Sequence, residues 1–580
     1  MKNKFINIKP IGILLVLYGC FCLYSCKKDP LDMTPNGRIS LDKVFSDNDL
    51  TASYLNSVYG YIPLYGASYH SQSLLAAITD ESSDANAGII GGVLSTNWYN
   101  GALSANNLFA MNWYAQYWQG IRQANIFLDN IETATVNDPK NRSRWRGEAK
   151  VLRAFYYLEL IKQFGGMPVQ EESFPLDFDY TTLQRASFQE GVQFIVRNCD
   201  EALGEPDLPF RIQNPNERGR FTKAIALAIK SEALLFNASP LWNPENDPAK
   251  WENAAIGCKQ ALDQLVSNGY ALYPDYEAYF KRESDVSNNP SDKETIFEIL
   301  NPDNMRFIFV TQTIPSLAGA VQAGAGPSQE LVDSYDMKDS GQPAILGYQD
   351  DDHLQPIINA TSGYDETKPY EGRDPRFYAT IFYNGAYFSN INGTDHYIES
   401  YVGGADGLMP TVNSHTHTGY YLRKFIDTDL RQGDGIISAS KWKKYRLAEM
   451  YLNLAEAENE ANGPTSTAYE AINAIRKRVQ MPDLPPGLTQ DEFRDRVHRE
   501  RRVELAFEEH RFWDVRRWKI LSETDKQVSG MRWIEQGNGT FAGSRFVADH
   551  RNAWQDRFLL FPIPLSELSK LPAFEQNPGW

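Results

Sequence analysis

The sequence predicts a mainly α-helical protein, built from paired helices that carry long, loop-rich and aromatic-rich insertions. Three observations lead to this fold class. Several long segments place apolar residues at steps of three and four, the period of a helix with one buried face. Capping residues, prolines and glycines stand at the ends of these segments. Between them, residues 66–112 and 270–440 are dense in Gly, Pro, Asn, Tyr and Phe and have no sustained helical period.

The N-terminal half carries the first set of helix signals. In 145–164 apolar residues recur on one side, and Gly165-Gly166 follows, where a helix is expected to end and the chain to turn. Similar signals predict four more helices: one from Ser40, one from the capping box of Ser187 and Glu190 to about Leu203, one over 224–237, and one from Asp247 to Leu265.

The C-terminal half repeats this pattern. Residues 442–462 are predicted to form one helix, and 468–479 to follow as its antiparallel neighbour. Thr489 and Glu492 form a second capping box. We expect it to start one long helix whose apolar side continues to Trp518.

The insertions have a different character. Within 340–420, short alternating pieces at 376–383 and 396–402 predict hairpins. Loops of this length are normally functional or disordered, and the aromatic content argues against disorder. The helix pairs recur without a strict spacing of about 34 residues, so periodicity alone supports helix pairs and no named repeat.

The first residues have the layout of a bacterial lipoprotein signal. A basic start precedes the apolar run 11–24, which is too short to span a bilayer comfortably. The run ends in Leu23-Tyr24-Ser25-Cys26, which resembles a lipobox. We therefore expect residues 1–25 to be a signal peptide, Cys26 to carry the lipid, and 26–39 to form a tether. The alternative is an ordinary cleaved signal with a chance cysteine.

The charge of the chain bears on its partners. The formal net charge is −17, and residues 1–25 contain three lysines and no acidic residue, so the rest of the chain is near −20. A surface this acidic repels nucleic-acid phosphates and lacks the basic patch that such binders need. The charge therefore argues against nucleic acid as a partner.

Two cysteines, Cys199 and Cys258, remain beyond Cys26. Both lie in predicted helices, and neither has the CxxC or Cys/His spacing of a metal site. Two buried thiols are favoured, and a disulfide in an oxidising envelope stays open as the alternative.

Five blocks carry more specific patterns: Trp118 to Ile131, Arg146 to Val169 with its Phe164-Gly165-Gly166-Met167-Pro168, Tyr445 to Ala457, Glu500 to Trp518, and Phe561 to Trp580. Together they resemble the SusD/RagB family of outer-membrane nutrient-binding lipoproteins, the starch-utilisation-system type. The resemblance covers nearly the whole mature chain.

This resemblance implies a fold and a role. The implied fold is an α-α superhelix of about four tetratricopeptide-like helix pairs, with an N-terminal part over 40–270 and a C-terminal part over 271–580. The second part would contain a loop-rich insertion at about 300–440. The implied role is that of a lid, anchored to the outer membrane and facing the cell exterior. It would cover a SusC-like TonB-dependent transporter and pass captured glycan or peptide into it.

Sugar recognition needs flat aromatic faces and planar polar groups. Their best concentration is Asn97-Trp98-Tyr99-Asn100, set in Gly-rich polar sequence. Trp98 and Tyr99 are poor residues to leave exposed on a loop without a ligand or partner. We therefore predict that these four residues bind ligand. The alternative is that Trp98 packs the loop onto the scaffold.

Further candidates lie in two other segments. Asp80, in a Thr-Asp-Glu stretch, is predicted either to bind ligand or to brace the loop. The strand-like segment 306–312 adds Phe307, Phe309 and Gln312 as predicted ligand residues. The alternative is that one of the two phenylalanines belongs to the core.

Glycan is the preferred ligand because aromatic platforms suit sugars, and peptide cargo is the alternative. A surface hydrolase and a helical-repeat scaffold that recruits proteins are the rivals. The sequence has no GxSxG, HExxH or P-loop motif, and its histidines have no helical metal spacing. No catalytic residue, metal or cofactor is therefore predicted. The secretory start distinguishes the protein from a cytosolic scaffold.

Overall fold

The computed structural model describes residues 39–63, 74–85, 97–98, 100–108, 112–175, 177–281, 292–299, 313–320, 322–428, 442–551 and 555–580. The predicted signal peptide, Cys26 and the tether up to residue 38 lie outside these residues, as do Tyr99, Phe307, Phe309 and Gln312. None of the helices in the described ranges is long and apolar enough to cross a membrane.

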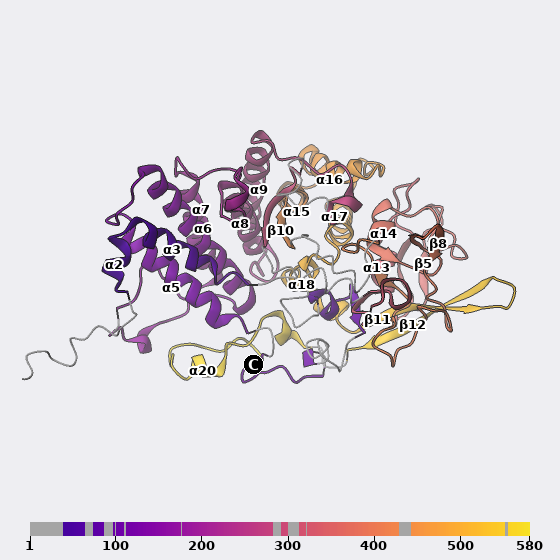
Figure 1. Cartoon of the computed structure of the whole chain (residues 1–580). Coiled ribbons are helices and arrows are strands. Elements are labelled where there is room, and N and C mark those ends of the chain that lie inside the picture. Colours follow the sequence, from indigo (N-terminus) through magenta and orange to yellow (C-terminus); the bar gives the residue numbers. More distant parts are fainter. Residues whose placement is uncertain are drawn as a thin grey trace, which may run out of the picture.

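The helices of the N-terminal part gather on the left of Figure 1. They are α2 (Leu41–Phe45), α3 (Asn48–Tyr59), α5 (Tyr114–Asn130), α6 (Pro139–Phe164), α7 (Phe188–Leu203), α8 (Lys223–Ala238) and α9 (Pro248–Ser267). From α5 to α9, each helix packs on the next one in the chain. The predicted starts are confirmed: Ser40 caps α2, and Ser187 and Glu190 form the capping box of α7.

The helices α15 (Leu447–Asn462), α16 (Ser466–Arg478) and α17 (Gln490–Glu504) continue the same array in the upper part of Figure 1. They are followed by α18 (His510–Arg517) and the short α19 (Leu521–Thr524) and α20 (Leu565–Leu568), and α20 lies at the lower left of the picture. Because α15 packs against both α8 and α9, it joins the two halves into one array. The predicted mainly helical superhelix with loop-rich insertions is confirmed.

The predicted helix over 442–462 is wrong at its start. Residues 442–446 form strand β10 (Trp442–Arg446), which pairs antiparallel with β2 (Thr295–Ile299). Trp442 and Tyr445 are buried in this strand, and aromatic side chains favour strands when they pack on a half-buried sheet surface. Helix α15 therefore begins only at Leu447.

The predicted long helix after the second capping box is two helices. α17 ends at Glu504, and Phe507 and Glu509 adopt positive φ before α18 begins. The main-chain carbonyl of Glu504 accepts a hydrogen bond from Nη2 of Arg446 at 2.9 Å. A side chain thus bonds a carbonyl that a continuous helix would use, as is common at helix ends.

The insertions lie on the right of Figure 1 and contain two-stranded antiparallel sheets. The pairs are β1 (Ser82–Asp84) with β3 (Ala325–Pro327), β4 (Ile345–Tyr348) with β5 (Pro356–Ile358), β6 (Ile381–Phe382) with β9 (Tyr421–Leu422), β7 (Tyr387–Ile391) with β8 (Thr394–Tyr397), and β11 (Gln527–Glu535) with β12 (Phe541–His550). The remaining short helices of the described residues are α10 (Tyr276–Tyr279), α12 (Pro315–Ala318), α13 (Gln329–Ser334), α14 (Pro375–Thr380), η2 (Leu75–Ile78), η4 (Tyr180–Thr182), η5 (Pro215–Glu217) and η7 (Asp556–Leu559).

The hairpin predictions within this region are partly wrong. The piece 376–383 begins inside α14, because Asp374 caps a helix turn with Pro375 at its first position. Its short strand β6 pairs with β9. The piece 396–402 contributes only its first two residues to a strand, β8, which pairs with β7.

One large hydrophobic core runs through the helix array and the C-terminal return of the chain. Cys199 and Cys258 are buried in this core as free thiols, as the sequence favoured. Burial raises the pKa of the Cys258 thiol to about 12, so the group stays protonated.

A buried ion-pair network ties α14, β10 and α16 to α17. The carboxylate of Glu504 lies 3.0 Å from Nη1 of Arg376, 2.7 Å from Nη1 of Arg446 and 2.5 Å from Nη2 of Arg478. Burial opposes ionisation of Glu504, but the three guanidinium charges hold its pKa well below the usual value. One ionised carboxylate therefore links three elements that lie far apart in the sequence.

Candidate functional site

Trp98 belongs to the interior. Its side chain is only 1% exposed, and its ring centroid lies 5.1 Å from that of Phe558 and 5.3 Å from that of Phe561. The guanidinium group of Arg516 stands 4.9 Å from the ring. Trp98 thus packs its loop onto the C-terminal segment. This burial contradicts the prediction that Trp98 is an exposed ligand platform, because no ring face is left for a sugar.

The neighbours of Trp98 are placed differently. Asn97 is half-buried, and Asn100 is exposed, with its side-chain oxygen accepting from the main-chain N of Ala102 at 2.9 Å. Tyr99 lies outside the described residues. A ligand role for these three residues stays a prediction.

Asp80 also lies in the interior, between η2 and β1. Nε and Nη2 of Arg511 each donate to one of its carboxylate oxygens at 2.8 Å, and Nη2 of Arg502 lies 3.0 Å away. Burial alone would raise the pKa of Asp80, but the charges of Arg502 and Arg511 hold it well below the usual range. A carboxylate engaged in this way braces the loop, so the bracing alternative describes Asp80 and the ligand prediction does not.

Asp80→Asn is expected to lower the free energy of unfolding by about 2 kcal/mol, because the buried guanidinium group of Arg511 loses its anionic partner. Urea denaturation followed by circular dichroism measures this loss. The exposed Asp177→Asn serves as the control and is expected to leave stability unchanged. If Asp80→Asn were as stable as the wild type but bound glycan poorly, the bracing role would be refuted.

An open groove lies between the loop 209–222 and strand β2. It consists of two adjoining hollows of about 300 and 390 Å³, which share Arg218, Phe297 and Glu298 in their walls. Further planar polar groups and aromatic rings in the walls come from Asn56, Tyr59, Arg211, Gln213, Asn214, Asn216, Arg220 and Tyr270. These are the two kinds of group that sugar recognition needs.

Both walls of the groove are anchored by local structure. The loop is closed where the main-chain N of Lys223 donates to the carbonyl of Pro209 at 2.9 Å, and Thr222 caps α8 directly after it. Gly219 supplies the positive φ, +73°, that the turn requires. The opposite wall, β2, is held by its pairing with β10. The polar groups of the groove are therefore presented from fixed backbone.

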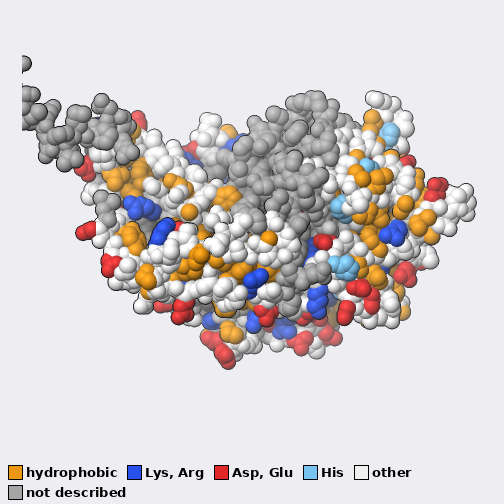
Figure 2. Space-filling view, turned by 90° about the horizontal axis from the view of Figure 1, so that it is seen from below, with side chains coloured by type: hydrophobic (Ala, Val, Ile, Leu, Met, Phe, Trp, Pro, Cys, Tyr) orange, Lys and Arg blue, Asp and Glu red, His pale blue; other side chains and the backbone are white. Residues whose placement is uncertain are grey.

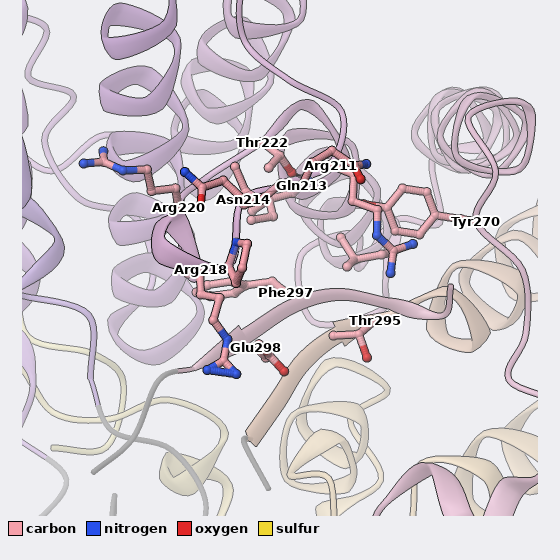
Figure 3. Close-up of a pocket in the computed structure, with 15 residues that line it drawn as sticks. Arg211, Gln213, Asn214, Arg218, Arg220, Thr222, Tyr270, Thr295, Phe297 and Glu298 are labelled. Atoms are coloured by element: carbon pink, nitrogen blue, oxygen red, sulfur yellow. Dashed lines mark hydrogen bonds between the residues drawn. The ribbon is translucent and has the colours of Figure 1, made fainter. Parts of the chain in front are cut away.

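One end of the groove is formed by Arg211 and Tyr270. Figure 3 shows the guanidinium group of Arg211 beside the ring of Tyr270, 5.2 Å from its centroid. The same group donates to the main-chain carbonyl of Asp292. The phenol of Tyr270 donates to the carbonyl of Phe210 at 3.3 Å, and burial raises its pKa to about 12. Tyr270 is therefore a neutral platform that fixes the direction of Arg211.

The other end of the groove is built on Glu148. Its Oε2 accepts from the phenol of Tyr59 and from Nη1 of Arg220, both at 2.8 Å. Nη2 of Arg220 also donates to the side chain of Asn56 at 2.7 Å. The buried carboxylate thus holds an aromatic ring and a guanidinium group in the groove wall.

The strand that forms one wall of the groove ends shortly before a predicted ligand segment in the sequence. Ile299, the last residue of β2, lines the second hollow, and the segment 300–312 with Phe307, Phe309 and Gln312 follows it directly. The groove residues themselves were missed in the sequence analysis. The available signal was the stretch 211–220, which places three arginines and three amides within a loop of an acidic chain. No group of three His, Cys, Asp or Glu side chains suited to a metal ion occurs among the described residues.

Known proteins share this sequence and fold along nearly the whole chain. SusD-like protein P25 of Formosa agariphila is 23% identical over 98% of both chains. A SusD-like protein of known structure from Bacteroides fragilis matches with a TM-score of 0.77 at 28% identity, covering 94% of this chain and 100% of that one. A laminarin-binding SusD-like protein shares the fold with a TM-score of 0.58 at 22% identity, over 92% of this chain and 100% of its own.

Two family descriptions also match. Residues 31–235 match a family described as starch-binding and associating with the outer membrane. Residues 277–580, more than half of the chain, match the SusD family. With the helix array, the loop-rich insertions and these matches in agreement, the chain belongs to the SusD family.

Proposed function

We propose that this protein binds an oligo- or polysaccharide at the cell surface and delivers it to a SusC-like TonB-dependent transporter of the outer membrane. The groove beside β2 carries the proposal, because it is open and combines aromatic rings with fixed amide and guanidinium groups. The match to starch-binding proteins that associate with the outer membrane supports the same class of ligand. So does the name of the laminarin-binding relative.

In this proposal the protein is held at the outer membrane by lipid on Cys26 and faces the cell exterior. Acyl chains contribute about 0.8 kcal/mol per buried methylene, so a multiply acylated cysteine is a firm anchor. Replacing Cys26 by alanine is the direct test. The variant should be released from the membrane fraction, and a variant that stays bound would refute this anchor.

The groove favours binding over hydrolysis. Among the described residues, the carboxylates in its wall belong to Glu217 and Glu298. Glu217 lies 3.0 Å from Nη2 of Arg144, in an ion pair. A glycosidase needs two carboxyl groups placed across the bond that is cleaved, and the carboxylate of Glu217 is instead engaged by Arg144.

Binding of the mature chain to a panel of polysaccharides by affinity electrophoresis tests the function. We expect retardation by one class of glycan, and Gln213→Ala to weaken it about fivefold by removing an amide that bonds sugar hydroxyls. Gln189→Ala, on the exposed start of α7, is the matched control. Phe307→Ala and Tyr99→Ala test whether the predicted loop residues complete the same site.

The outcomes separate the alternatives. Loss of retardation in Phe307→Ala or Tyr99→Ala, with Gln213→Ala unaffected, would move the site from the groove to those loops. Retardation by no glycan, together with binding of peptides, would assign the protein to peptide cargo. Delivery to a transporter is tested by extracting the protein in mild detergent, where it should co-purify with a barrel-sized partner. Purification of the protein without such a partner would count against delivery.

A further inference from the structure

We propose that the groove takes an anionic glycan, with a sugar carboxylate or sulfate bound at the Arg211–Tyr270 end. This inference rests on the proposed function of glycan binding. It adds the charge of the ligand and the residue that recognises it.

The guanidinium groups of Arg144 and Arg220 at the Glu148 end of the groove are engaged in ion pairs. Glu148 is bridged by Nε of Arg144 at 2.9 Å and by Nη1 of Arg220 at 2.8 Å. Arg144 also lies 3.0 Å from Glu217. These two arginines are therefore committed to the fold.

Arg211 has a different environment at the opposite end. Its guanidinium group is bonded to the main-chain carbonyl of Asp292 and stacked beside Tyr270, and both partners are uncharged. The carboxylate of Asp292 accepts instead from its own turn, from the main-chain N of Glu294 at 2.9 Å and the hydroxyl of Thr295 at 2.7 Å. Among the described residues, no carboxylate forms an ion pair with Arg211. Its positive charge therefore remains available at the groove wall.

The remaining carboxylate among the described wall residues is that of Glu298. It is buried within β2, where it stands opposite Lys443 of β10 in the strand register. A ligand at the Arg211 end therefore meets a guanidinium group that has no ion-pair partner among the described residues.

The geometry of Arg211 suits a planar or tetrahedral anion. A guanidinium group presents parallel N–H donors that match the oxygen spacing of carboxylate and sulfate, and an aromatic neighbour orients it in advance. Half-burial of Arg211 reduces screening by water, which strengthens a charged hydrogen bond. The exposed amides of Gln213 and Asn214 stand in the same wall, where they can bond the hydroxyls of the same sugar.

The rest of the molecule makes this positive end selective. The chain carries a formal net charge of −17. Figure 2 shows acidic side chains recurring along the edges of the face seen there. An anionic polymer is repelled by such a surface and gains affinity only where arginine charge is uncompensated. Attraction to an anionic glycan is therefore expected to be local and not a property of the whole surface.

The test compares polymers that differ only in charge. The mature chain is titrated with polygalacturonate and its methyl ester, and with dextran sulfate and dextran, at low and moderate salt. We expect one anionic polymer to bind, its neutral counterpart to bind at least tenfold more weakly, and salt to weaken the anionic complex. The carboxylate pair and the sulfate pair distinguish the two sources of negative charge.

Variants locate the site. Arg211→Gln is expected to weaken anion binding about tenfold, and Arg211→Lys, which keeps the charge without the fork, by less. Arg197→Gln, on the exposed side of α7, makes the same change in net charge and should bind like the wild type. Thermal melting of each variant checks folding, and Arg211→Lys keeps the comparison valid if Arg211→Gln unfolds.

The outcomes separate this inference from the function on which it rests. Equal binding of charged and neutral partners would overturn the anionic specificity and leave glycan binding intact. Binding of neither pair, with no retardation by any other polysaccharide, would overturn glycan binding itself. Equal losses in Arg211→Gln and Arg197→Gln would overturn the assignment to Arg211.

Discussion

Trp98→Ala is expected to lower the free energy of unfolding by about 3–5 kcal/mol, the usual range for removing a large aromatic side chain from a core. Trp98 contacts the rings of Phe512, Phe558 and Phe561, with centroids 5.7, 5.1 and 5.3 Å away. The substitution leaves a cavity between its loop and the C-terminal segment, so both should loosen together.

Urea denaturation of Trp98→Ala measures this loss. Unfolding is followed by far-ultraviolet circular dichroism, because this signal of the backbone does not rely on the tryptophan that is removed. Trp98→Phe keeps an aromatic ring and should lose less. Tyr180→Ala removes an aromatic side chain that is 40% exposed and should have little effect. A Trp98→Ala protein of wild-type stability that no longer binds glycan would restore Trp98 as a ligand platform.

Glu504→Gln is expected to have an effect of similar size, about 3–5 kcal/mol, because it removes one anion from a buried ion-pair network that three arginines share. Here Arg376, Arg446 and Arg478 all bond the one carboxylate. Glutamine has nearly the same volume, so the loss reports charge and hydrogen bonding, not packing. Glu470→Gln, on the exposed side of α16, is the control for a change in net charge.

The effect of Glu504→Gln should depend on pH in a defined direction. The folded pKa of Glu504 lies well below the usual value of a glutamate, because three guanidinium groups surround the carboxylate. Its ionised form therefore stabilises the fold fully above the unfolded carboxyl pKa of about 4.3. This contribution is lost as pH falls through the folded pKa. The stability difference between wild type and variant should be constant from pH 5 to 8 and narrow only in stronger acid. A difference that narrows above pH 5 would contradict the low pKa.

Helix starts could be predicted because the groups that make them lie within one turn. Ser187 and Glu190 satisfy each other's main-chain N–H groups without help from the rest of the chain. The break after α17 and the strand at 442–446 depend on partners far away in the sequence, Arg446 for the first and β2 for the second. No local pattern contains that information.

The difference between local and distant partners also explains which features of the candidate site could be predicted. Aromatic and amide residues in a polar loop can be recognised in the sequence, but whether their side chains are buried is decided by what covers the loop. The rings that enclose Trp98 and the arginines that hold Asp80 come from the last eighty residues. The arginine-rich and amide-rich stretch 211–220 is visible in the sequence, yet only the fold sets it opposite β2.

The bracing of the η2–β1 segment has a consequence for the order in which the protein folds as the chain is synthesised. Carbonyl groups of this segment, from Ala77, Thr79 and Ser82, accept hydrogen bonds from Arg551, and Asp80 pairs with Arg511. The pairs α5–α6 through α8–α9 need only neighbouring residues, so they can form as the chain emerges. The segment near Asp80, although it is made early, must stay solvated until almost the last residues of the chain are made. A chain truncated before Arg511 should therefore contain a folded helical half beside an open, protease-sensitive loop.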